Sequence, residues 1–364
     1  MARDIINPKD TTSIIQMNDV INELEVNVGF LMNSGLFTEE LTARDTVVEQ
    51  INKQNKRGML GLTSRRERNK VKHTRRKAKQ WSVQIPYQET IEEVTKEDVF
   101  QVAKDWETAT EEQIMDVYER KLIPMKESIE NAREYIYWTA AQGITRDPRD
   151  GSVVLDMFEK HGINRTEIDV DLTDLSLNLL VWMAEFRNRV VKDNKRGSTQ
   201  GVIEIFVTQE VFSAFVKHPS VFAAYQMAYQ TRGKEYLDNV ARPFGTTTRG
   251  AYGIVQEFEH DNVRIIVAPQ TFILEDGDVY EDGTYDSVDA VEAGTGFAVV
   301  RGVRDAFRAY FSQSNDLMSG GLAKTYAWRS EIKDNAFFEM TASSAPIAYT
   351  TAPELCYKFK FKTA

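Results

Sequence analysis

The spacing of apolar residues predicts one long helix in the first half of the chain. The recurring positions, three or four residues apart, are Ile114, Tyr118, Leu122, Met125, Ile129, Ala132, Ile136 and Thr139. Thr110 and Gln113 form a capping-box signature before this run, and Gly143 follows it. About thirty residues at about 1.5 Å each give a rod of roughly 45 to 50 Å. Pro124 lies inside the run, and we expect it to kink the rod or to mark a boundary between two helices.

Four shorter helices are expected elsewhere, the last of them at residues 220–230. The first carries apolar residues at helical spacing from Ile14 to Leu24, and it needs the rest of the chain or another copy to bury them. The second spans residues 175–192, with Asp174 as its cap. The third spans residues 209–217 and is stopped by a proline that follows closely.

Alternating apolar and polar residues predict many short strands. Residues 46–51 and 81–87 alternate on either side of a polar segment, which indicates a long two-stranded excursion from the body. Residues 148–151 are a turn signal inside an expected hairpin. Further strands are expected at 201–208, 251–257, 263–268, 296–301, 326–328, 337–341 and 356–362. Helices and strands mixed in this way predict an α+β fold.

Length and composition narrow the class of protein. The chain has 364 residues, 42% of them hydrophobic, which excludes a disordered or fibrous protein. A net charge of −10 argues against nucleic-acid binding over the whole surface. The single cysteine, Cys356, excludes a disulfide framework and a zinc site built from several cysteines. Neither a signal peptide nor an apolar run of membrane-spanning length is readable, so we expect a soluble protein made in a reducing cytoplasm.

Positive charge is concentrated in one segment. Residues 53–79 hold twelve Lys or Arg and a single acid, Glu67. The candidate intersubunit contacts in this basic segment are Arg57, Arg65, Arg66, Arg68, Lys70, Lys72, Arg75, Arg76, Lys77 and Lys79. We favour contact with an acidic surface of another subunit. Two alternatives stay open: contact with nucleic acid, although no interleaved aromatic residues offer a stacking platform, and a solvated loop without a partner.

Patterns for catalysis, metal binding or cofactor binding are not readable. The four histidines share no metal-ligand spacing and are His73, His161, His218 and His260. No serine has the G-x-S-x-G context of a nucleophile elbow. Residues 294–296 begin like a dinucleotide fingerprint but lack its third glycine, and the acidic loop 275–292 lacks the spacing of a calcium loop. We therefore expect a protein that is not an enzyme and has no cofactor.

Three stretches resemble one protein family. Phe37 to Glu40, leading into Thr46 to Glu49, is similar to the start of that family's extended loop. Residues 206–219 are similar to a strand and helix of its axial domain, and residues 338–354 to its closing strands. The family is the lambda-like E family of tailed-bacteriophage major capsid proteins, with the Hong Kong 97 capsid fold. The order of parts resembles this family over nearly the whole chain.

The resemblance implies a fold in five parts. They would be an N-terminal arm at 1–46, an extended basic loop at 47–88, a peripheral domain with the spine helix at 89–173, a compact axial α/β domain at 174–314, and C-terminal strands returning to the peripheral domain at 315–364. Shells of this kind expand from a precursor form, and Pro124 is then a candidate hinge of the spine helix.

The resemblance also implies a function and partners. Subunits would form hexamers and pentamers of an icosahedral shell in the virion, assembled in the host cytoplasm around double-stranded DNA that is bound without sequence specificity. A portal and a decoration protein are further expected partners. The short stretch before residue 40 leaves no room for a fused scaffold, so we expect a separate scaffolding protein or a trimmed chain. The alternatives are an encapsulin-like cellular nanocompartment shell and a nucleic-acid-binding protein acting through residues 53–79.

Overall fold

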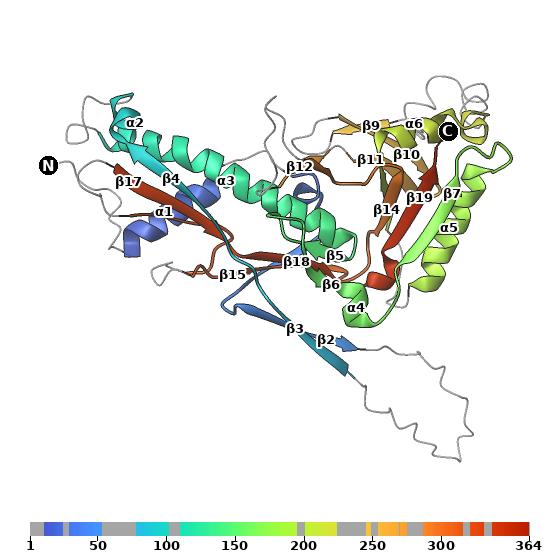
Figure 1. Cartoon of the computed structure of the whole chain (residues 1–364), viewed down its shortest axis with the longest axis horizontal. Helices are drawn as coiled ribbons and strands as arrows, with labels where there is room; N and C mark the ends of the chain where they lie inside the picture. The colour runs from blue at the N-terminus through green and yellow to red at the C-terminus, as the bar shows by residue number, and fades with distance from the viewer. Residues whose placement is uncertain are drawn as a thin grey trace, which may run out of the picture.

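The longest element is α3 (Glu111–Ala141), which runs along the molecule in the computed structural model (Figure 1). Thr110 caps it as expected, because Thr110 and Gln113 each accept a hydrogen bond from the other's backbone N–H. It is a single helix through Pro124, so the expected boundary between two helices is wrong. Pro124 lies on the exposed side, where water reaches the carbonyl that lost its N–H partner.

The described part of the chain mixes helices with short strands, as the α+β prediction required. The structure describes residues 11–24, 29–52, 78–101, 110–194, 201–223, 245–248, 254–268, 270–274, 287–315, 321–330 and 337–363. Within these residues, no helix is long and apolar enough to cross a membrane.

A seven-stranded sheet forms the larger core. In spatial order its strands are β7 (Thr166–Asp171), β19 (Tyr357–Lys362), β14 (Thr295–Val300), β8 (Ile203–Val207), β11 (Val263–Val267), β10 (Ile254–His260) and β9 (Gly245–Thr248). All five residues of β8 are buried. Two helices, α5 (Leu179–Asp193) and α6 (Gln209–Lys217), pack on the sheet: the Phe186 ring lies 5.1 Å from that of Phe359, and the Phe215 ring 5.4 Å from that of Phe258.

The start of α5 differs from the sequence prediction. Asp174 does not cap it, because its carboxylate accepts hydrogen bonds from the backbone and hydroxyl of Ser176 and forms a separate turn. Asn178 is the cap instead and accepts from the backbone N–H of Leu180 and Val181. The helix therefore begins four residues later than the predicted start at residue 175.

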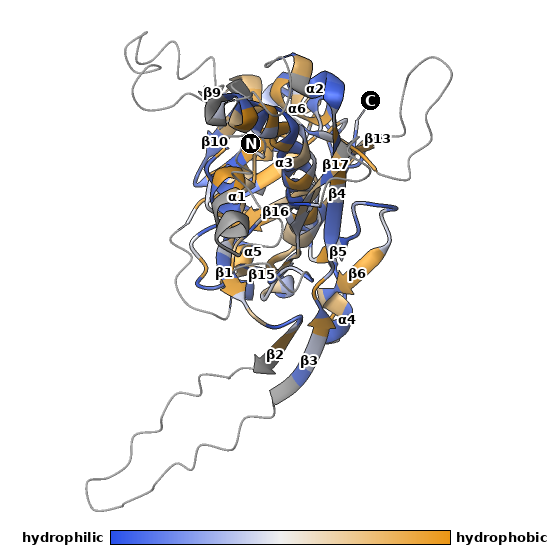
Figure 2. Cartoon of the chain, turned by 90° about the vertical axis from the view of Figure 1, so that its left-hand side faces the viewer, coloured by the Kyte–Doolittle hydropathy of each residue, from blue (hydrophilic) through white to orange (hydrophobic). Residues whose placement is uncertain are grey.

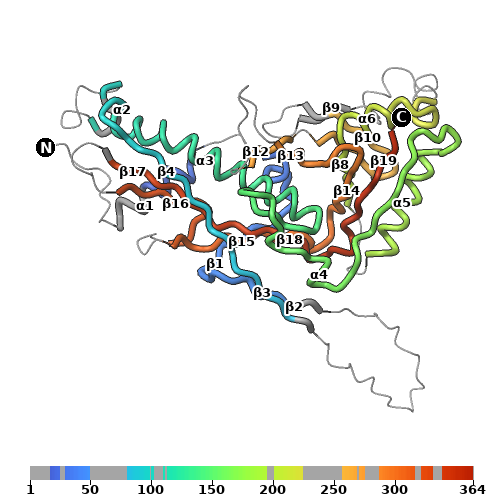
Figure 3. Tube along the Cα trace, viewed as in Figure 1, coloured from blue at the N-terminus to red at the C-terminus, as the bar shows by residue number. Residues whose placement is uncertain are grey.

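Five smaller sheets occur among the described residues. They are β1–β15–β18, β16–β17–β4, β2–β3, β5–β6 and β12–β13. Their strands are β1 (Thr38–Thr42), β2 (Thr46–Asn52), β3 (Ala78–Gln84), β4 (Gln88–Thr95), β5 (Ile144–Arg146), β6 (Val153–Asp156), β12 (Thr271–Ile273), β13 (Ser287–Asp289), β15 (Phe307–Ser312), β16 (Tyr326–Arg329), β17 (Phe337–Ser344) and β18 (Pro346–Thr350). The short helices are α1 (Thr11–Glu23), α2 (Lys96–Phe100), α4 (Met157–His161), η1 (Met32–Ser34) and η3 (Pro353–Leu355). Figure 3 shows distant parts of the chain side by side, with β4 in cyan along β17 in red.

Two strands from the predicted peripheral segments lie in the seven-stranded sheet. β7 comes from residues 89–173 and β19 from residues 315–364, yet they pair parallel with each other, and β19 also pairs with β14. The apolar faces of both strands explain the placement, because Val170 and Phe359 are buried in the core of the sheet. The segment 315–364 therefore contributes to both ends of the molecule. The domain boundaries themselves stay predictions.

Within the ranges that the structure describes, buried apolar residues form three clusters. The sheet cluster surrounds the seven-stranded sheet and includes Trp138, Phe206 and Phe359. The spine cluster consists of Met17, Ile21, Val94, Ile114, Val117, Tyr118, Leu122, Met125, Ile129, Ala327, Phe338, Met340 and Ala342. The loop-base cluster consists of Val47, Trp81, Ile85, Leu155, Met157, Ala345, Ile347 and Tyr349. Hydrophobic and hydrophilic residues alternate around α3, which touches the first two clusters (Figure 2).

Candidate assembly site

The base of the two-stranded excursion is fixed to the body along one face. β2 pairs antiparallel with β3 over all seven of its residues, so the expected ladder is confirmed. Val47 and Trp81 are each 6% exposed and belong to the loop-base cluster. The Trp81 ring meets the Tyr349 ring edge to face, with centroids 5.2 Å apart. The excursion therefore leaves the body in a direction set by buried side chains.

A polar contact supports the same face of the ladder. Arg308 pairs with the Glu49 carboxylate at 2.7 Å, and the Tyr349 hydroxyl donates to the same oxygen at 2.8 Å. Burial opposes the charge on Arg308, but Glu49, Tyr310 and Tyr349 together outweigh it and raise the pKa of Arg308. Burial, together with Glu49, also raises the pKa of Tyr349. Both residues therefore keep their protons, and the contact stays intact near neutral pH.

The basic segment itself is largely outside the described residues. Of the ten candidate contacts, Arg57, Arg65, Arg66, Arg68, Lys70, Lys72, Arg75, Arg76 and Lys77 fall there. Lys79 lies in β3, where its backbone is paired opposite Ile51. The contact of these residues with another subunit stays a prediction.

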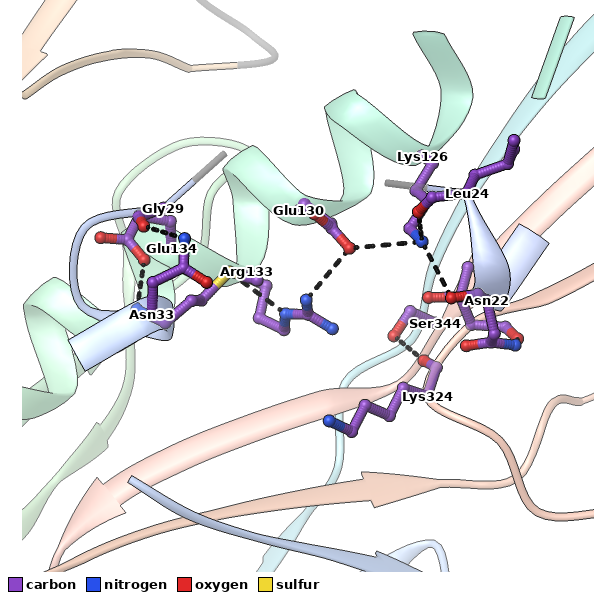
Figure 4. A network of polar contacts seen from close by, with 12 residues as sticks. Asn22, Leu24, Gly29, Asn33, Lys126, Glu130, Arg133, Glu134, Lys324 and Ser344 are labelled. Carbon is purple, nitrogen blue, oxygen red and sulfur yellow. Dashed lines mark hydrogen bonds and ion pairs between the residues drawn. The ribbon is translucent and has the colours of Figure 1, made fainter. Parts of the chain in front are cut away.

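A second polar site lies on one face of α3 (Figure 4), under α1 and residues 29–34, which we call the N-terminal segment. Lys126, Glu130, Arg133 and Glu134 are between 0% and 8% exposed. We call these four residues the buried charge cluster. The Arg133 guanidinium lies 3.3 Å from Glu130, and the Lys126 ammonium 3.9 Å from the same carboxylate. Charged side chains this deeply buried need partners, and most of these partners are backbone atoms of the N-terminal segment.

Lys126 holds the end of α1. Its ammonium donates to the backbone carbonyls of Asn22 at 3.3 Å and Leu24 at 2.5 Å. Carbonyls at the end of a helix lack partners within it, and a cation there also interacts favourably with the helix dipole. Burial lowers the pKa of Lys126 and raises the pKa of Glu130, because both charged forms are poorly hydrated there.

Glu134 holds the next part of the N-terminal segment. Its two carboxylate oxygens accept from the backbone N–H of Leu31 at 2.6 Å and of Met32 at 2.9 Å. The Trp138 indole donates to it at 2.8 Å. Gly29 packs so closely that a Cβ there would lie 2.8 Å from the carboxylate. Burial raises the pKa of Glu134 although these donors favour the charged form.

The contacts continue into β1. Glu39 accepts a hydrogen bond from Tyr137 on α3 at 2.6 Å and is ion-paired with Lys324. Burial opposes the charge on Glu39, but these two partners outweigh it and lower its pKa. Arg301 also donates to the backbone carbonyl of Ser34 at 2.9 Å. The stretch from α1 to β1 is thus fastened to α3 and its surroundings by a series of polar contacts.

The protein family of this chain follows from comparison with known families. The family model described as phage major capsid protein E matches residues 13–361. The chain belongs to the phage major capsid protein E family. A major capsid protein of Salmonella phage Felix O1 is 22% identical over 336 residues, which cover 90% of each chain. The predicted family is therefore confirmed.

Solved structures agree on the fold. A proposed prophage capsid protein from E. coli is 12% identical and has a TM-score of 0.52, with 96% of this chain and 99% of that chain covered. The Hong Kong 97-like capsid fold is thereby confirmed. An encapsulin complex from Synechococcus elongatus is 8% identical with a TM-score of 0.46, covering 96% and 98% of the two chains. Likeness to solved structures does not separate the capsid protein from the nanocompartment alternative. The family model separates them, because it is described as a phage major capsid protein.

The histidines and acids of the capsid protein form no metal centre in the part that the structure describes. There, no group of three or more His, Cys, Asp or Glu side chains is placed to hold an ion. His218 is buried, and its ring nitrogens lie 2.8 Å from the Ser220 hydroxyl and 3.1 Å from the Asp174 carbonyl. It therefore ties a turn to a helix end. Most of the acidic loop, residues 275–286, and His73 are outside the described residues.

Sequence reasoning about the capsid protein missed the buried charge cluster. Charged residues on a predicted helix read as its solvent face, so the four residues gave no sign of burial. One signal was available: Lys126, Glu130 and Arg133 recur by four and three residues, in step with the apolar positions Met125, Ile129 and Ala132. A charged stripe directly beside an apolar stripe is also the ordinary edge of an amphipathic surface helix, so this signal alone does not indicate burial.

Proposed function

We propose that the capsid protein assembles as hexamers and pentamers into an icosahedral shell that encloses packaged double-stranded DNA. Membership of the phage major capsid protein E family carries the proposal. The fixed base of the β2–β3 excursion supports it, because an arm that leaves the body in a defined direction suits a contact with a neighbouring subunit. The shell would meet DNA on its inner face through charge alone, without sequence specificity.

The basic segment 53–79 is the proposed contact with the neighbour. It has twelve basic residues and one acidic residue. In the whole chain the balance is reversed, because 55 Asp and Glu outnumber 45 Lys and Arg. The body of each subunit is therefore strongly acidic. Opposite charges of this kind speed association and set the register between subunits. The ten basic candidate residues would act in this contact.

The family places the protein in the virion capsid. We propose that assembly takes place in the host cytoplasm and involves a scaffolding protein, a portal and a decoration protein. A shell subunit performs its role by binding other copies of itself, which requires no catalytic step. The protein would accordingly be a structural protein and not an enzyme.

Negative-stain microscopy of the purified full chain, alone and with a candidate scaffolding protein, tests the shell. Closed shells, tubes or capsomer rings are the expected result. A small oligomer that never closes, with or without the scaffolding protein, would contradict the proposal. The family match makes phage-like shells the expected outcome.

A loop deletion separates the shell from the nucleic-acid alternative. The last paired residues of the ladder are Asn52 and Ala78, so residues 53–77 can be replaced by an Asn-Gly turn that closes it as a hairpin. The variant should keep its fold, by circular dichroism, and lose assembly. A matched variant keeps the full length but has Gln at the basic positions of this segment. Retained assembly with loss of nucleic-acid binding in both variants would favour the alternative.

A further inference from the structure

The β2–β3 excursion joins the body through two short connections. Residues 43–45 lead from β1 into β2, and residues 85–87 lead from β3 into β4. The connections are tied to each other, because the backbone N–H of Ile85 donates to the Asp45 carbonyl at 2.8 Å. Each residue has two soft backbone dihedral angles, so a ladder on such short connections can pivot unless contacts further along hold its angle.

Open space borders the two connections. A cavity of about 350 Å³ lies beside them, and Asp45, Ile85, Pro86 and Tyr87 contribute to its lining. Close packing fixes a segment only where neighbouring side chains fill the space around it. The angle of the excursion must therefore be set by contacts of the ladder itself.

The ladder has two kinds of contact with the body. Val47 and Trp81 are buried in the loop-base cluster, where the apolar attraction holds the ladder close but has no preferred direction. Glu49 lies two residues beyond Val47, and side chains at this spacing share a face of the strand. Its carboxylate is held by hydrogen bonds to ionised groups, which are short and directional. The polar contact is therefore the one that can define an angle.

Arg308 is itself held in place by the body. It lies in β15, the central strand of its sheet, where it pairs with Thr38 of β1 and Tyr349 of β18. Its guanidinium donates to the Tyr310 hydroxyl at 3.3 Å and lies 3.8 Å from Asp305, while it pairs with Glu49 at 2.7 Å. A guanidinium is a rigid planar group, so these partners orient it toward the excursion.

We propose that Arg308 is the positioning residue that sets the angle at which the excursion leaves the body. Seven paired residues at about 3.3 Å each span about 23 Å, so a swing of about 20° moves the end of the ladder by about 8 Å. Such a displacement is longer than an ion pair, and it would take the basic segment out of register with a second copy of this chain. The role deepens the proposed function and rests on it for its purpose.

Distances between two spin labels, measured by double electron–electron resonance on the full-length chain kept unassembled by dilution, test the angle. Gln80→Cys places one label on the excursion and Glu185→Cys places the other on α5; both positions are exposed, whereas Cys356 is buried. The parent should give one narrow distance distribution. In Arg308→Met, which keeps an unbranched stem but removes the charge, the distribution should broaden or shift by about 4 Å or more. Glu49→Lys, which places two like charges together, should have the same effect.

Arg304→Met is the matched control. Arg304 is four residues before Arg308 and pairs with Asp305 at 3.4 Å, but its side chain is 92% exposed. The control removes the same charge and should leave the distribution narrow. A second pair of labels, at the exposed positions Glu159 and Glu185, measures the body alone and should keep its distance in every variant.

Three results would overturn the role of Arg308. They are an unchanged distribution in Arg308→Met or Glu49→Lys, an equal change in Arg304→Met, and an equal change between the two body labels, which would make Arg308 an ordinary structural residue. The distances are measured on unassembled chains, so the role is judged independently of shell formation. A changed angle in the variants of a chain that never forms shells would uphold the role and contradict the proposed function.

Discussion

The sulfur of Cys356 is buried and out of contact with solvent. The residue is 4% exposed, and its thiol contacts the Ala141 carbonyl at 3.6 Å. Burial raises the pKa of the thiol to about 12. The thiolate is the form that attacks electrophiles, and its population at neutral pH is therefore very small.

We predict that Cys356 does not react with a thiol reagent such as dithionitrobenzoate in the native protein at pH 8. In denaturant it should react completely, because the unfolded chain has an accessible thiol with an ordinary pKa. The absorbance of the coloured product measures the extent of reaction in both states. Complete reaction gives one equivalent of product per chain, since the chain has only this cysteine. Rapid stoichiometric labelling of the native chain would contradict the burial.

Residues of the same type have very different surroundings here, which sets a limit on sequence reasoning. Lys121 is a partly exposed ion-pair partner, while Lys126, five positions later on the same helix, is 5% exposed. The difference arises because a segment about one hundred residues earlier in the chain covers Lys126. No local pattern contains that information, so the buried charge cluster could not be predicted from the sequence.

At the scale of elements, the turn after α3 depends on a glycine. Gly143 has φ of +90°, a conformation that other residues adopt at a cost. A Cβ built there would lie 2.7 Å from the Phe158 ring, which is 6% exposed. The turn therefore requires both the backbone freedom and the small size of glycine, and it fixes how α3 leads into the hairpin β5–β6.

We predict that Gly143→Ala lowers the free energy of unfolding by about 3 kcal/mol, from left-handed backbone strain plus overpacking. Gly162→Ala is the matched control: its φ is +66°, but no heavy atom lies within 4 Å of the built Cβ. The control should cost about 1 kcal/mol. Urea denaturation of unassembled chains measures both values, and equal losses would refute the role of Phe158.

Pro124 remains the candidate hinge of α3. The chain continues as one helix through it, so bending there would need no unfolding of the helix. Pro124→Ala restores a backbone N–H that can complete the helix ladder, and we predict that the variant forms precursor shells but expands poorly on packaging. Particle diameter before and after packaging measures this. Ser128→Ala is the control on the same helix. It removes the side-chain hydrogen bond of 3.0 Å from Ser128 to the Pro124 carbonyl and leaves Pro124 in place. Expansion equal to that of the parent would exclude the hinge.

Elements with local signals were predictable, and elements defined by distant partners were not. α3 begins directly after its expected cap Thr110, and α6 spans the expected residues 209–217, because a capping box precedes the first helix and a proline follows the second. β18 is buried over all five residues and shows no alternation. β1 pairs parallel with β15, which lies near the other end of the chain. Such strands become visible only once the sheet is assembled.

At the scale of the whole molecule, charge is divided between a basic excursion and an acidic body. The base of the excursion is held by Val47, Trp81 and Glu49, so the basic segment departs from a fixed place. A contact of opposite charges weakens when salt screens them, and screening is already strong at about 0.15 M. Contacts between apolar surfaces show the reverse dependence.

We predict that assembly of the purified chain weakens as NaCl rises from about 50 mM to about 500 mM, because the Debye length falls well below the size of the contact. Light scattering measures assembly. In a variant with Arg65, Arg66 and Arg68 changed to Gln, assembly should be weaker at low salt and its dependence on salt smaller. Assembly that is indifferent to salt in the parent would remove charge complementarity from the proposed contact.

The position of β19 has a consequence for how the subunit is made. β19 follows the other described strands in the sequence, yet it lies between β7 and β14 inside the seven-stranded sheet. The sheet therefore cannot close before β19 has been synthesised and has left the ribosome, and a chain that is cut short before β19 leaves β7 and β14 without their common neighbour. Truncated products would fail to fold instead of entering the shell as defective copies. Completion of the core sheet thus depends on synthesis of the chain through β19.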